Sequence, residues 1–360
     1  MTDMEKKRLL ICGTGFGKIY INAISKSDKY ELGGILGTGS SRTRELAEMF
    51  GVPCYTDMND AIGKVDGACV IVPNAAGGGN GSAIACELLK KNIPTLLEHP
   101  AHEKEILDCL KASSKTTPFM LNPFYRYTEA VSEFIKLARY MATKSKIINA
   151  SLNCAIHVLY DGIDMLGCAL GDISKWKLGD ASEGVETALS GAGNRTVNAV
   201  IGEIPTMITV NTNVDSTDPD HPMHLYHEIG ITFTTGKLIL VNTNGPIVWL
   251  PFAKIPRNAN NTLRFENGDA ELNIPSGIVL SGTEAPSVSQ TFSRIWTGAV
   301  IKALDELFSQ DITKKRMDGQ YQIFVSRLWS DICQRVGYAK LVQYESVGDV
   351  KAVYDNIINK

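Results

Sequence analysis

The sequence predicts an α/β chain of two domains, in which a doubly wound parallel sheet is followed by an α+β domain with a large, open, mostly antiparallel sheet. The length of 360 residues exceeds what one small core can organise. In the first third, short apolar runs alternate with amphipathic helical stretches, and beyond it long strand-like runs follow one another. We therefore assign residues 1–123 and 124–360 to two domains.

The expected strands of the first domain are apolar runs bounded by glycine, proline or charged residues. They cover residues 9–12, 30–36, 54–55, 67–72, 95–97 and 119–121. Helices between them are expected at 17–25, 41–50, 81–91 and 103–114, with a short turn at 57–62. Strands that alternate with helices favour a parallel sheet covered on both faces. The Rossmann dinucleotide fold is the simplest such arrangement.

The second domain is expected to begin with a helix near residues 127–141, where apolar residues recur at helical spacing. The strands expected after it cover 146–155, 207–214, 228–234, 238–242 and 247–250. Because the Thr235-Gly236 step suits a hairpin turn, consecutive strands are expected to pair antiparallel. Further helices are expected at 162–170, 299–308 and 323–336. Helices would cover one face of this sheet and leave the other open to substrate or a second subunit.

The composition points to a small-molecule enzyme of the cytoplasm. The net charge is −3, and no concentrated run of Lys or Arg offers a surface for nucleic acid or an anionic membrane. No stretch approaches the ~18 consecutive apolar residues of a membrane span. The first residues lack the pattern of a signal peptide. The eight cysteines are scattered without a Cys-x-x-Cys pair, so we expect reduced thiols.

A glycine-rich turn directly after the first strand predicts a dinucleotide site. In Gly13-Thr14-Gly15-Phe16-Gly17, the first glycine permits a tight turn. The second glycine lets the backbone approach a pyrophosphate at the start of the next helix. Lys18 stands where the usual fingerprint has a third glycine, so the match is incomplete. The place of the turn in the first β-α unit is what favours a cofactor site over an ordinary turn.

The end of the second strand predicts NADPH rather than NADH. An NAD enzyme places Asp or Glu there to bind the ribose 2′-hydroxyl, whereas this sequence has Ser40-Ser41-Arg42 and no acid until Glu45. Hydroxyl and guanidinium groups would bind a 2′-phosphate that a carboxylate would repel. A serine at this position can also cap the next helix.

Residues after the fourth, fifth and sixth strands complete the expected site. The fourth strand runs into Pro73-Asn74 and a glycine-rich turn, which either contacts the cofactor or forms an exposed loop. The fifth strand ends at Glu98-His99-Pro100, and Tyr125 follows the sixth. Because ligands bind outside the carboxyl ends of such strands, these side chains are expected to face one crevice.

The order of elements and Glu98-His99-Pro100 resemble the glucose-fructose oxidoreductase and inositol dehydrogenase superfamily. This tripeptide usually reads Glu-Lys-Pro there, with a catalytic lysine. A set of segments in both domains narrows the resemblance to the thiazolinyl imine reductases of yersiniabactin- and pyochelin-type siderophore assembly lines. These are Gly15-Phe16-Gly17 with Tyr20, Gly39-Ser40-Ser41-Arg42 with Arg44-Glu45-Leu46-Ala47, Glu98-His99-Pro100-Ala101-His102, Asn122-Pro123-Phe124-Tyr125, Gly245-Pro246-Ile247-Val248-Trp249 and Ser326-Arg327-Leu328-Trp329. The resemblance ends at about Gly337 and is poor at 180–225 and after 255.

The resemblance implies NADPH-dependent reduction of a thiazoline to a thiazolidine while the substrate is a thioester on a peptide-synthetase carrier domain. It implies His99 and Tyr125 as proton donors, roles that suit an imidazole and a supported phenol. His102, three residues beyond His99, is expected to be exposed. The residues expected to bind the cofactor are Gly13, Thr14, Gly15, Phe16, Gly17, Ser40, Ser41, Arg42, Pro73, Asn74 and Glu98.

Two other functions stay open from the sequence. Asp161 and Asp164 lie where sugar dehydrogenases of the superfamily keep a Gly/His/Asp motif, but the histidine of that motif is missing. An NADP-dependent sugar or polyol dehydrogenase is therefore the runner-up. The third reading is a dinucleotide-sensing regulator that has lost the chemistry.

Neither a metal site nor a monomer is expected. The candidate metal ligands are His221, His224 and His227 with Asp218 and Asp220. On a strand, residues three apart point to opposite faces, so these histidines would not converge. The open sheet face predicts a homodimer, because exposed apolar sheet surface tends to be covered.

Overall fold

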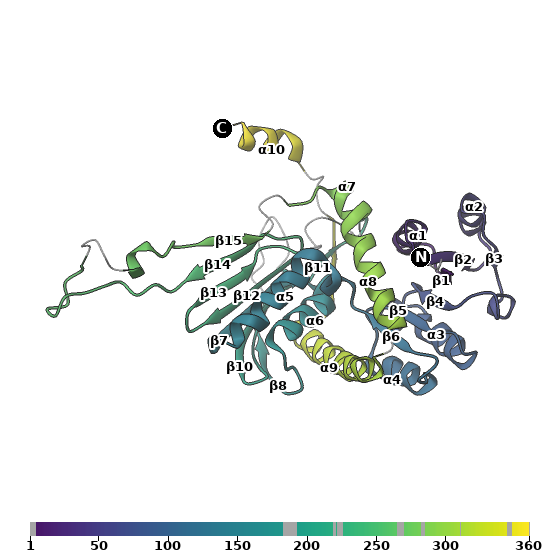
Figure 1. Cartoon of the computed structure of the whole chain (residues 1–360), viewed down its shortest axis with the longest axis horizontal. Helices are drawn as coiled ribbons and strands as arrows, with labels where there is room; N and C mark the ends of the chain where they lie inside the picture. The colour runs from purple at the N-terminus through teal and green to yellow at the C-terminus, as the bar shows by residue number, and fades with distance from the viewer. Residues whose placement is uncertain are drawn as a thin grey trace.

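The computed structural model describes residues 5–182, 193–218, 221, 226–264, 270–281, 285–309, 311–343 and 348–359. Two large sheets organise these residues, one of six strands and one of eight, with helices between and around them (Figure 1). A two-stranded sheet pairs β11 (Asn213–Asp215) with β16 (Lys340–Val342). Among the described residues, no helix is both long and apolar enough to span a lipid bilayer.

The N-terminal sheet is wholly parallel and has the strand order β3-β2-β1-β4-β5-β6. Its strands are β1 (Lys7–Cys12), β2 (Tyr30–Leu36), β3 (Cys54–Tyr55), β4 (Gly67–Val70), β5 (Thr95–Glu98) and β6 (Phe119–Asn122). β1 and β4 are the neighbours at which the strand order reverses. This is the doubly wound sheet that the sequence predicts, and its carboxyl edge between β1 and β4 is the switch point where ligands bind.

Four helices connect these strands at the expected places. They are α1 (Gly17–Ser25), α2 (Ser41–Met49), α3 (Gly81–Lys90) and α4 (Glu103–Ala112), and a single 3-10 turn spans Met58–Ala61. A fifth helix on this sheet comes from far along the chain, because α8 (Trp296–Phe308) packs on α1 and touches β5 and β6. The side chain of Asp305 on α8 accepts from Tyr30 Oη at 2.8 Å. The late helix thus ties the C-terminal part of the chain to the N-terminal sheet.

The C-terminal sheet has the order β15-β14-β13-β12-β7-β10-β9-β8 and is antiparallel except for the pair β7·β10. Its strands are β7 (Ile147–Ala155), β8 (Trp176–Ala181), β9 (Asn194–Ile201), β10 (Ile204–Asn211), β12 (His227–Phe233), β13 (Gly236–Leu240), β14 (Ile247–Pro251) and β15 (Ile278–Ser281). The prediction of a large, mostly antiparallel sheet is confirmed. The sequence did not predict β8, β9 or β15.

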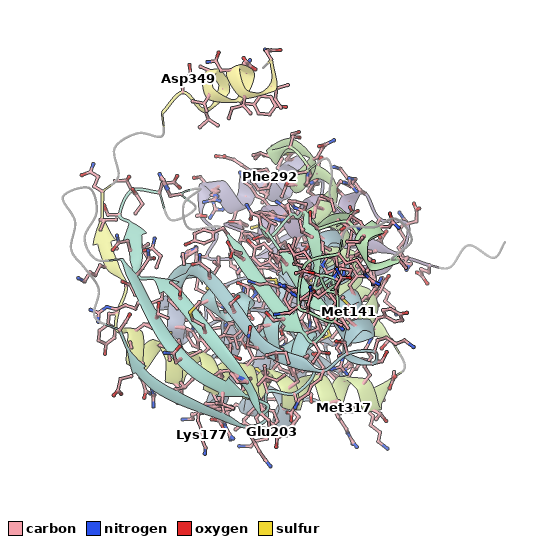
Figure 2. All side chains as sticks on the ribbon, turned by 90° about the vertical axis from the view of Figure 1, so that its left-hand side faces the viewer. Met141, Lys177, Glu203, Phe292, Met317 and Asp349 are labelled. Atoms are coloured by element: carbon pink, nitrogen blue, oxygen red, sulfur yellow. The ribbon has the colours of Figure 1, made fainter. Side chains whose placement is uncertain are left out.

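One face of this sheet carries helices α5 (Glu129–Ala142), α6 (Leu159–Leu170) and α9 (Ile312–Val336) (Figure 1). The inward side chains of β7, such as Leu152 and Cys154, are fully buried against α6, nearly all of which is buried itself. α9 begins eleven residues earlier than predicted, because its first turns are polar and carry no apolar stripe. α10 (Val350–Ile358) stands apart from the other helices and strands in Figure 1, and Figure 2 shows it clear of the packed side chains.

Candidate functional site

Two adjoining cavities lie along the carboxyl edge of the N-terminal sheet. We name the first the nucleotide cavity; it encloses about 530 Å³ between the glycine-rich turn after β1 and the start of α2. We name the second the catalytic cavity; it encloses about 340 Å³ and lies against the ends of β4, β5 and β6. Val72 lines both, so the two cavities meet at the end of β4.

The turn after β1 has the backbone that a dinucleotide pyrophosphate requires. Gly13 has a φ of +98°, and a Cβ there would lie 3.1 Å from the carbonyl of Ile71, so only glycine fits without strain. At Gly15, a Cβ would meet no atom within 4 Å, which leaves open space in front of the backbone. α1 begins at Gly17, so the positive end of its helix dipole lies directly after the glycine-rich turn and would favour an anion there. These residues therefore fit a pyrophosphate.

Two of the three side chains predicted at the start of α2, Ser40 and Arg42, line the nucleotide cavity. Ser40 caps α2 by accepting from the Thr43 N–H at 3.4 Å, and its side chain remains exposed. The Arg42 guanidinium reaches across to donate to the Thr14 carbonyl at 3.0 Å. No acidic residue is among the described residues that line this cavity. Ser41 is exposed but does not line it, so its predicted contact with the cofactor has no support from the cavity.

The segment after β4 is tied to the segment after β5. Asn74 is buried, and its amide Nδ2 donates to the carbonyls of Glu98 at 2.8 Å and Pro100 at 2.9 Å. Glu105 accepts from the Ala75 N–H at 3.1 Å. Pro73, Asn74 and Gly77 line the catalytic cavity and Asn80 lines the nucleotide cavity, although residues 75–80 are exposed. The glycine-rich turn is therefore anchored at its beginning and open beyond it.

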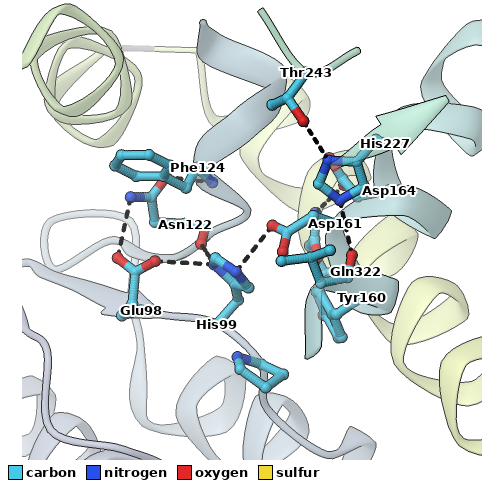
Figure 3. A network of polar contacts seen from close by, with 12 residues as sticks. Glu98, His99, Asn122, Phe124, Tyr160, Asp161, Asp164, His227, Thr243 and Gln322 are labelled. Atoms are coloured by element: carbon cyan, nitrogen blue, oxygen red, sulfur yellow. Dashed lines mark hydrogen bonds and ion pairs between the residues drawn. The ribbon is translucent and has the colours of Figure 1, made fainter. Parts of the chain in front are cut away.

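His99 lies at the centre of a buried polar cluster at the end of β5 (Figure 3). Its Nδ1 lies 2.9 Å from Glu98 Oε1 and 2.8 Å from the Asn122 carbonyl. Its Nε2 lies 2.9 Å from Asp161 Oδ1, a carboxylate in the first turn of α6. The imidazole ring also stacks on Tyr160 with a centroid distance of 5.7 Å. Both ring nitrogens thus contact acceptors, an arrangement that favours the doubly protonated ring.

Burial and charge oppose each other at this histidine. Burial alone would lower the pKa of His99, but the carboxylates of Asp161 and Glu98 outweigh it and hold the pKa well above its usual value. Burial also raises the pKa of Glu98, although His99 counteracts this. His99 is therefore a cation at neutral pH. The positive charge lies on the wall of the catalytic cavity.

Glu98 has further partners that fix its carboxylate. Tyr20 on α1 donates its hydroxyl to Glu98 Oε2, and the Asn122 amide donates to the same oxygen at 3.4 Å. The Asn122 Nδ2 also donates to Tyr20 Oη at 2.6 Å. Three elements, α1, β5 and β6, thus hold one carboxylate next to His99. These hydrogen bonds offset part of the free-energy cost of burying that carboxylate.

Tyr125 shares the catalytic cavity with His99, as the sequence predicts. It belongs to a 3-10 turn, Phe124–Tyr127, directly after β6. Its ring packs edge-to-face on the imidazole of His227 at 5.3 Å between centroids. His227 is fully buried, donates from Nε2 to the Val158 carbonyl at 2.9 Å and lies 3.0 Å from Thr243 Oγ1 through Nδ1. Burial lowers the pKa of His227, so this imidazole is neutral.

Aromatic rings form another wall of the catalytic cavity. Phe16, Phe124 and Trp296 pack against one another with centroid distances of 5.4 to 5.8 Å. Trp296 opens α8 and directly follows a π-helical segment, Thr291–Ile295. Such segments often occur at functional sites. The cavity is therefore lined by ionisable groups around His99 and by the aromatic rings of Phe16, Phe124 and Trp296.

Three site residues were not predicted as such from the sequence. Tyr20 and Asn122 belong to segments that carry the family resemblance, but nothing in the sequence indicates that they hold Glu98. The sequence indicates Asp161 only as part of an incomplete sugar dehydrogenase motif, whereas in the structure it contacts His99 directly. The feature of the sequence that could have indicated Asp161 is the pair of carboxylates, Asp161 and Asp164, in an otherwise apolar stretch.

The structure also places His102 and some of the candidate metal ligands. His102 is exposed, as predicted, and its N–H donates to Glu105 at 2.9 Å at the start of α4. Of the candidate metal ligands, His227 points to Val158 and Thr243, while His224 and Asp220 lie outside the described residues.

Comparisons with known proteins agree with this architecture. Residues 7–117 match the model of the oxidoreductase family with an NAD-binding Rossmann fold. Residues 145–250 match the model of the thiazolinyl imine reductase Irp3-like C-terminal family. No curated protein matches the sequence significantly. Residues 7–117 are therefore similar to the NAD-binding Rossmann domains of this oxidoreductase family, and residues 145–250 are similar to the Irp3-like C-terminal domains.

Solved structures share the fold at low identity. GenD2 from gentamicin A biosynthesis, in complex with NAD, is 10% identical with a TM-score of 0.65 and covers 96% of this chain and 98% of its own. The WlbA dehydrogenase of Bordetella pertussis, in complex with NADH and UDP-GlcNAcA, is 16% identical with a TM-score of 0.63 over 92% and 95%. Levoglucosan dehydrogenase, in complex with NADH and levoglucosan, is 12% identical with a TM-score of 0.63 over 92% and 98%.

Proposed function

We propose that this oxidoreductase uses NADPH to reduce the C=N bond of a thiazoline to a thiazolidine, on a substrate tethered to a carrier domain of a nonribosomal peptide synthetase in siderophore biosynthesis. The observation that carries the proposal is the meeting of His99 and Tyr125 in one cavity next to the nucleotide cavity. The match of residues 145–250 to the Irp3-like reductases supports the choice of a thiazoline among C=N substrates.

The chemistry needs one hydride and one proton. When bound, the reduced nicotinamide supplies the hydride to the carbon of the C=N bond. Negative charge then develops on the nitrogen, which must also receive a proton. The cationic His99 offers a positive charge on the cavity wall, and the Tyr125 phenol lies on the same cavity as a second acidic group. A positioned acid of this kind contributes roughly 10²- to 10⁴-fold to the rate.

The preference for NADPH is supported by the side chains at the adenosine end. The Arg42 guanidinium lies over the turn at Thr14, and the Ser40 hydroxyl lines the same cavity. A 2′-phosphate would find a cation and a hydroxyl there and no lining carboxylate to repel it. An NAD-specific site would instead place Asp or Glu at the end of β2.

The shape of the catalytic cavity suits a ring substrate on a tether. Phe16, Phe124 and Trp296 form an apolar aromatic wall against which a planar heterocycle could pack. Phe16 and Phe292 are both partly exposed, so this aromatic surface continues from the cavity to solvent. A carrier-bound thioester could therefore reach the cavity along it.

A homodimer is the second proposed partner. Val200 on β9, Met207 on β10 and Val279 on β15 are all 41 to 50% exposed on the large sheet. Burying such side chains against a second copy would remove apolar surface from water. Light scattering of the purified chain at several concentrations would show a single species of twice the monomer mass, and a monomer throughout would contradict the proposal.

The activity is tested with a small thiazoline carboxylate thioester and NADPH. We expect NADPH to be consumed, and mass spectrometry to find a product two hydrogens heavier than the thiazoline. A parallel panel of sugars and polyols with NADP+ and NAD+ should give no reduction of cofactor. Turnover of a sugar without turnover of the thiazoline would replace the proposal by a sugar dehydrogenase, and tight NADPH binding with no turnover at all would favour a regulator.

A further inference from the structure

We propose that Asp161 is a positioning residue that reaches from the C-terminal part of the chain to hold the His99 side chain as a cation in one fixed orientation. His99 follows β5 of the N-terminal sheet, whereas Asp161 belongs to α6, which packs on the C-terminal sheet. Their contact, 2.9 Å between Nε2 and Oδ1, therefore crosses between the two halves of the molecule (Figure 3).

The orientation of the imidazole is fixed from three sides. Glu98 and Asp161 lie at opposite nitrogens of the ring, and Tyr160 stacks on its face. The Asp161 side chain is only 3% exposed and the His99 side chain 12%, so water hardly competes for these contacts. Ion pairs are stronger where water is excluded.

A close approach of α6 to the sheet brings Asp161 within reach. At Gly162, the next residue, a Cβ would lie 3.1 Å from both methyl groups of Leu152 on β7. Such a contact is tighter than ordinary packing, so a larger residue would push the first turn of α6 away from the sheet. The glycine thus permits the position from which Asp161 contacts His99.

Of the charged groups on α6, Asp161 is the one that contacts the His99 imidazole. Glu98 approaches from β5 and the Asn122 carbonyl from β6, while His227 on β12 is neutral and contributes no charge. Asp164, one turn further along α6, is fully buried and faces Arg126 and Gln322 instead. Without Asp161, burial would favour the neutral imidazole.

The inference concerns charge and orientation and adds no chemical step. It rests on the proposed function only for its effect on turnover, because the contact itself involves only residues of this chain. With both ring nitrogens in contact with acceptors, His99 is held as an imidazolium in one orientation on the cavity wall, between the carboxyl groups of Glu98 and Asp161. Such preorganised charge stabilises negative charge that develops in a transition state.

The test measures the protonation of His99 directly. The full-length chain with 15N-labelled histidine is titrated by NMR, and the His99 signal among the six histidines is the one that disappears in His99→Gln. We expect the wild-type ring to stay protonated through neutral pH, and Asp161→Asn to lower its midpoint by about 1 to 3 pH units. A matched control is Asp164→Asn, on the same helix and equally buried, which should leave the midpoint nearly unchanged. Asp161→Glu should restore most of the shift.

Two results would overturn the inference. One is a wild-type His99 that titrates at or below the usual histidine pKa, which needs no variant to fold. The other is a folded Asp161→Asn protein whose His99 midpoint equals that of the wild type. With a thiazoline substrate, Asp161→Asn should also move the alkaline decline of kcat to lower pH while the KM for NADPH stays constant. If the wild type turns over no C=N substrate, the proposed function fails and the NMR result still decides the role of Asp161.

Discussion

The two cavities of the site are built from different parts of the chain. The nucleotide cavity is formed by backbone and by short or exposed side chains of a single β-α-β unit, among them Gly13, Ser40 and Arg42. The catalytic cavity is formed by buried side chains from both halves of the molecule, such as Glu98, Tyr125 and Asp161. The nucleotide cavity is therefore a local feature of one β-α-β unit, whereas the arrangement of the side chains in the catalytic cavity depends on how the two halves pack.

This difference predicts how the two cavities respond to substitution. An exposed side chain such as Arg42 has no buried partner to lose, so its removal should change affinity and leave the fold intact. A member of the His99 cluster has charged neighbours that become unpaired when it is removed. Leaving a buried charge without its partner is costly to the folded state. Changes in the catalytic cavity should therefore affect turnover and stability together.

The largest effect is expected from the catalytic candidates. His99→Ala and Tyr125→Phe should each lower kcat for the thiazoline substrate by roughly 10²- to 10⁴-fold, because each removes a group that stabilises or protonates the nitrogen. NADPH binding, measured by fluorescence titration, should stay nearly constant because neither residue lines the nucleotide cavity.

His102→Ala is the control for this comparison, since His102 is an exposed histidine on the same segment and should leave kcat unchanged. Near wild-type turnover in both His99→Ala and Tyr125→Phe would remove the catalytic assignment. An equally large loss of NADPH affinity in either variant would show that the two cavities are not separable as described.

A smaller effect is expected at the adenosine end. Arg42→Ala should raise the KM for NADPH by about 10- to 100-fold, which corresponds to one charge-assisted hydrogen bond of ~1.5–3 kcal/mol. The KM for NADH should change little, because it has no 2′-phosphate. Arg44→Ala, two residues along the same helix and outside the cavity, is the control. Equal effects of Arg42→Ala on the two cofactors would contradict the NADPH preference.

The sequence predicts those elements whose apolar pattern is continuous. α1 begins and ends at the predicted residues because its buried side chains form one stripe, and the predicted residues 9–12 of β1 form an unbroken buried run. β8 was missed because its six residues read as mixed polar, with none of them fully buried. β9 buries only alternate residues on one face. Strands at the edge of an open sheet carry too weak a pattern to stand out from loops.

The same distinction applies to the site. Gly13, His99 and Tyr125 could be placed from sequence because each directly follows a strand of the parallel sheet, where ligands bind. Asp161 could not, because its contact with His99 depends on how closely α6 packs against β7 and on how the two halves meet. Patterns within a short stretch of sequence do not predict such packing between distant segments.

Glu105 joins three segments next to the two cavities and gives the smallest predicted effect. Its Oε1 accepts from the Ala75 N–H at 3.1 Å and from Ser82 Oγ at 2.6 Å, and its Oε2 accepts from the His102 N–H at 2.9 Å. One carboxylate thus ties the turn after β4, the start of α3 and the segment after His99. Burial would raise the pKa of Glu105, but these hydrogen bonds outweigh it and lower the pKa.

Glu105→Gln keeps the shape but can accept at only one of its two terminal atoms, so at least one of these bonds is lost. We expect a loss of about 1 kcal/mol in the free energy of unfolding at neutral pH and a rise of a few-fold in the KM for NADPH. Because the pKa is lowered on folding, the carboxylate stabilises the fold above the usual glutamate pKa, and this stabilisation disappears as the pH falls through the folded-state pKa. The difference between wild type and Glu105→Gln in urea unfolding should therefore shrink in acid.

Glu103→Gln is the control, because Glu103 lies on the same helix and pairs with Arg327 at the surface. It should show a smaller loss in the free energy of unfolding and no effect on the KM for NADPH. If the difference in the free energy of unfolding persists unchanged in acid, then the negative charge of Glu105 is not the source of its stabilising effect.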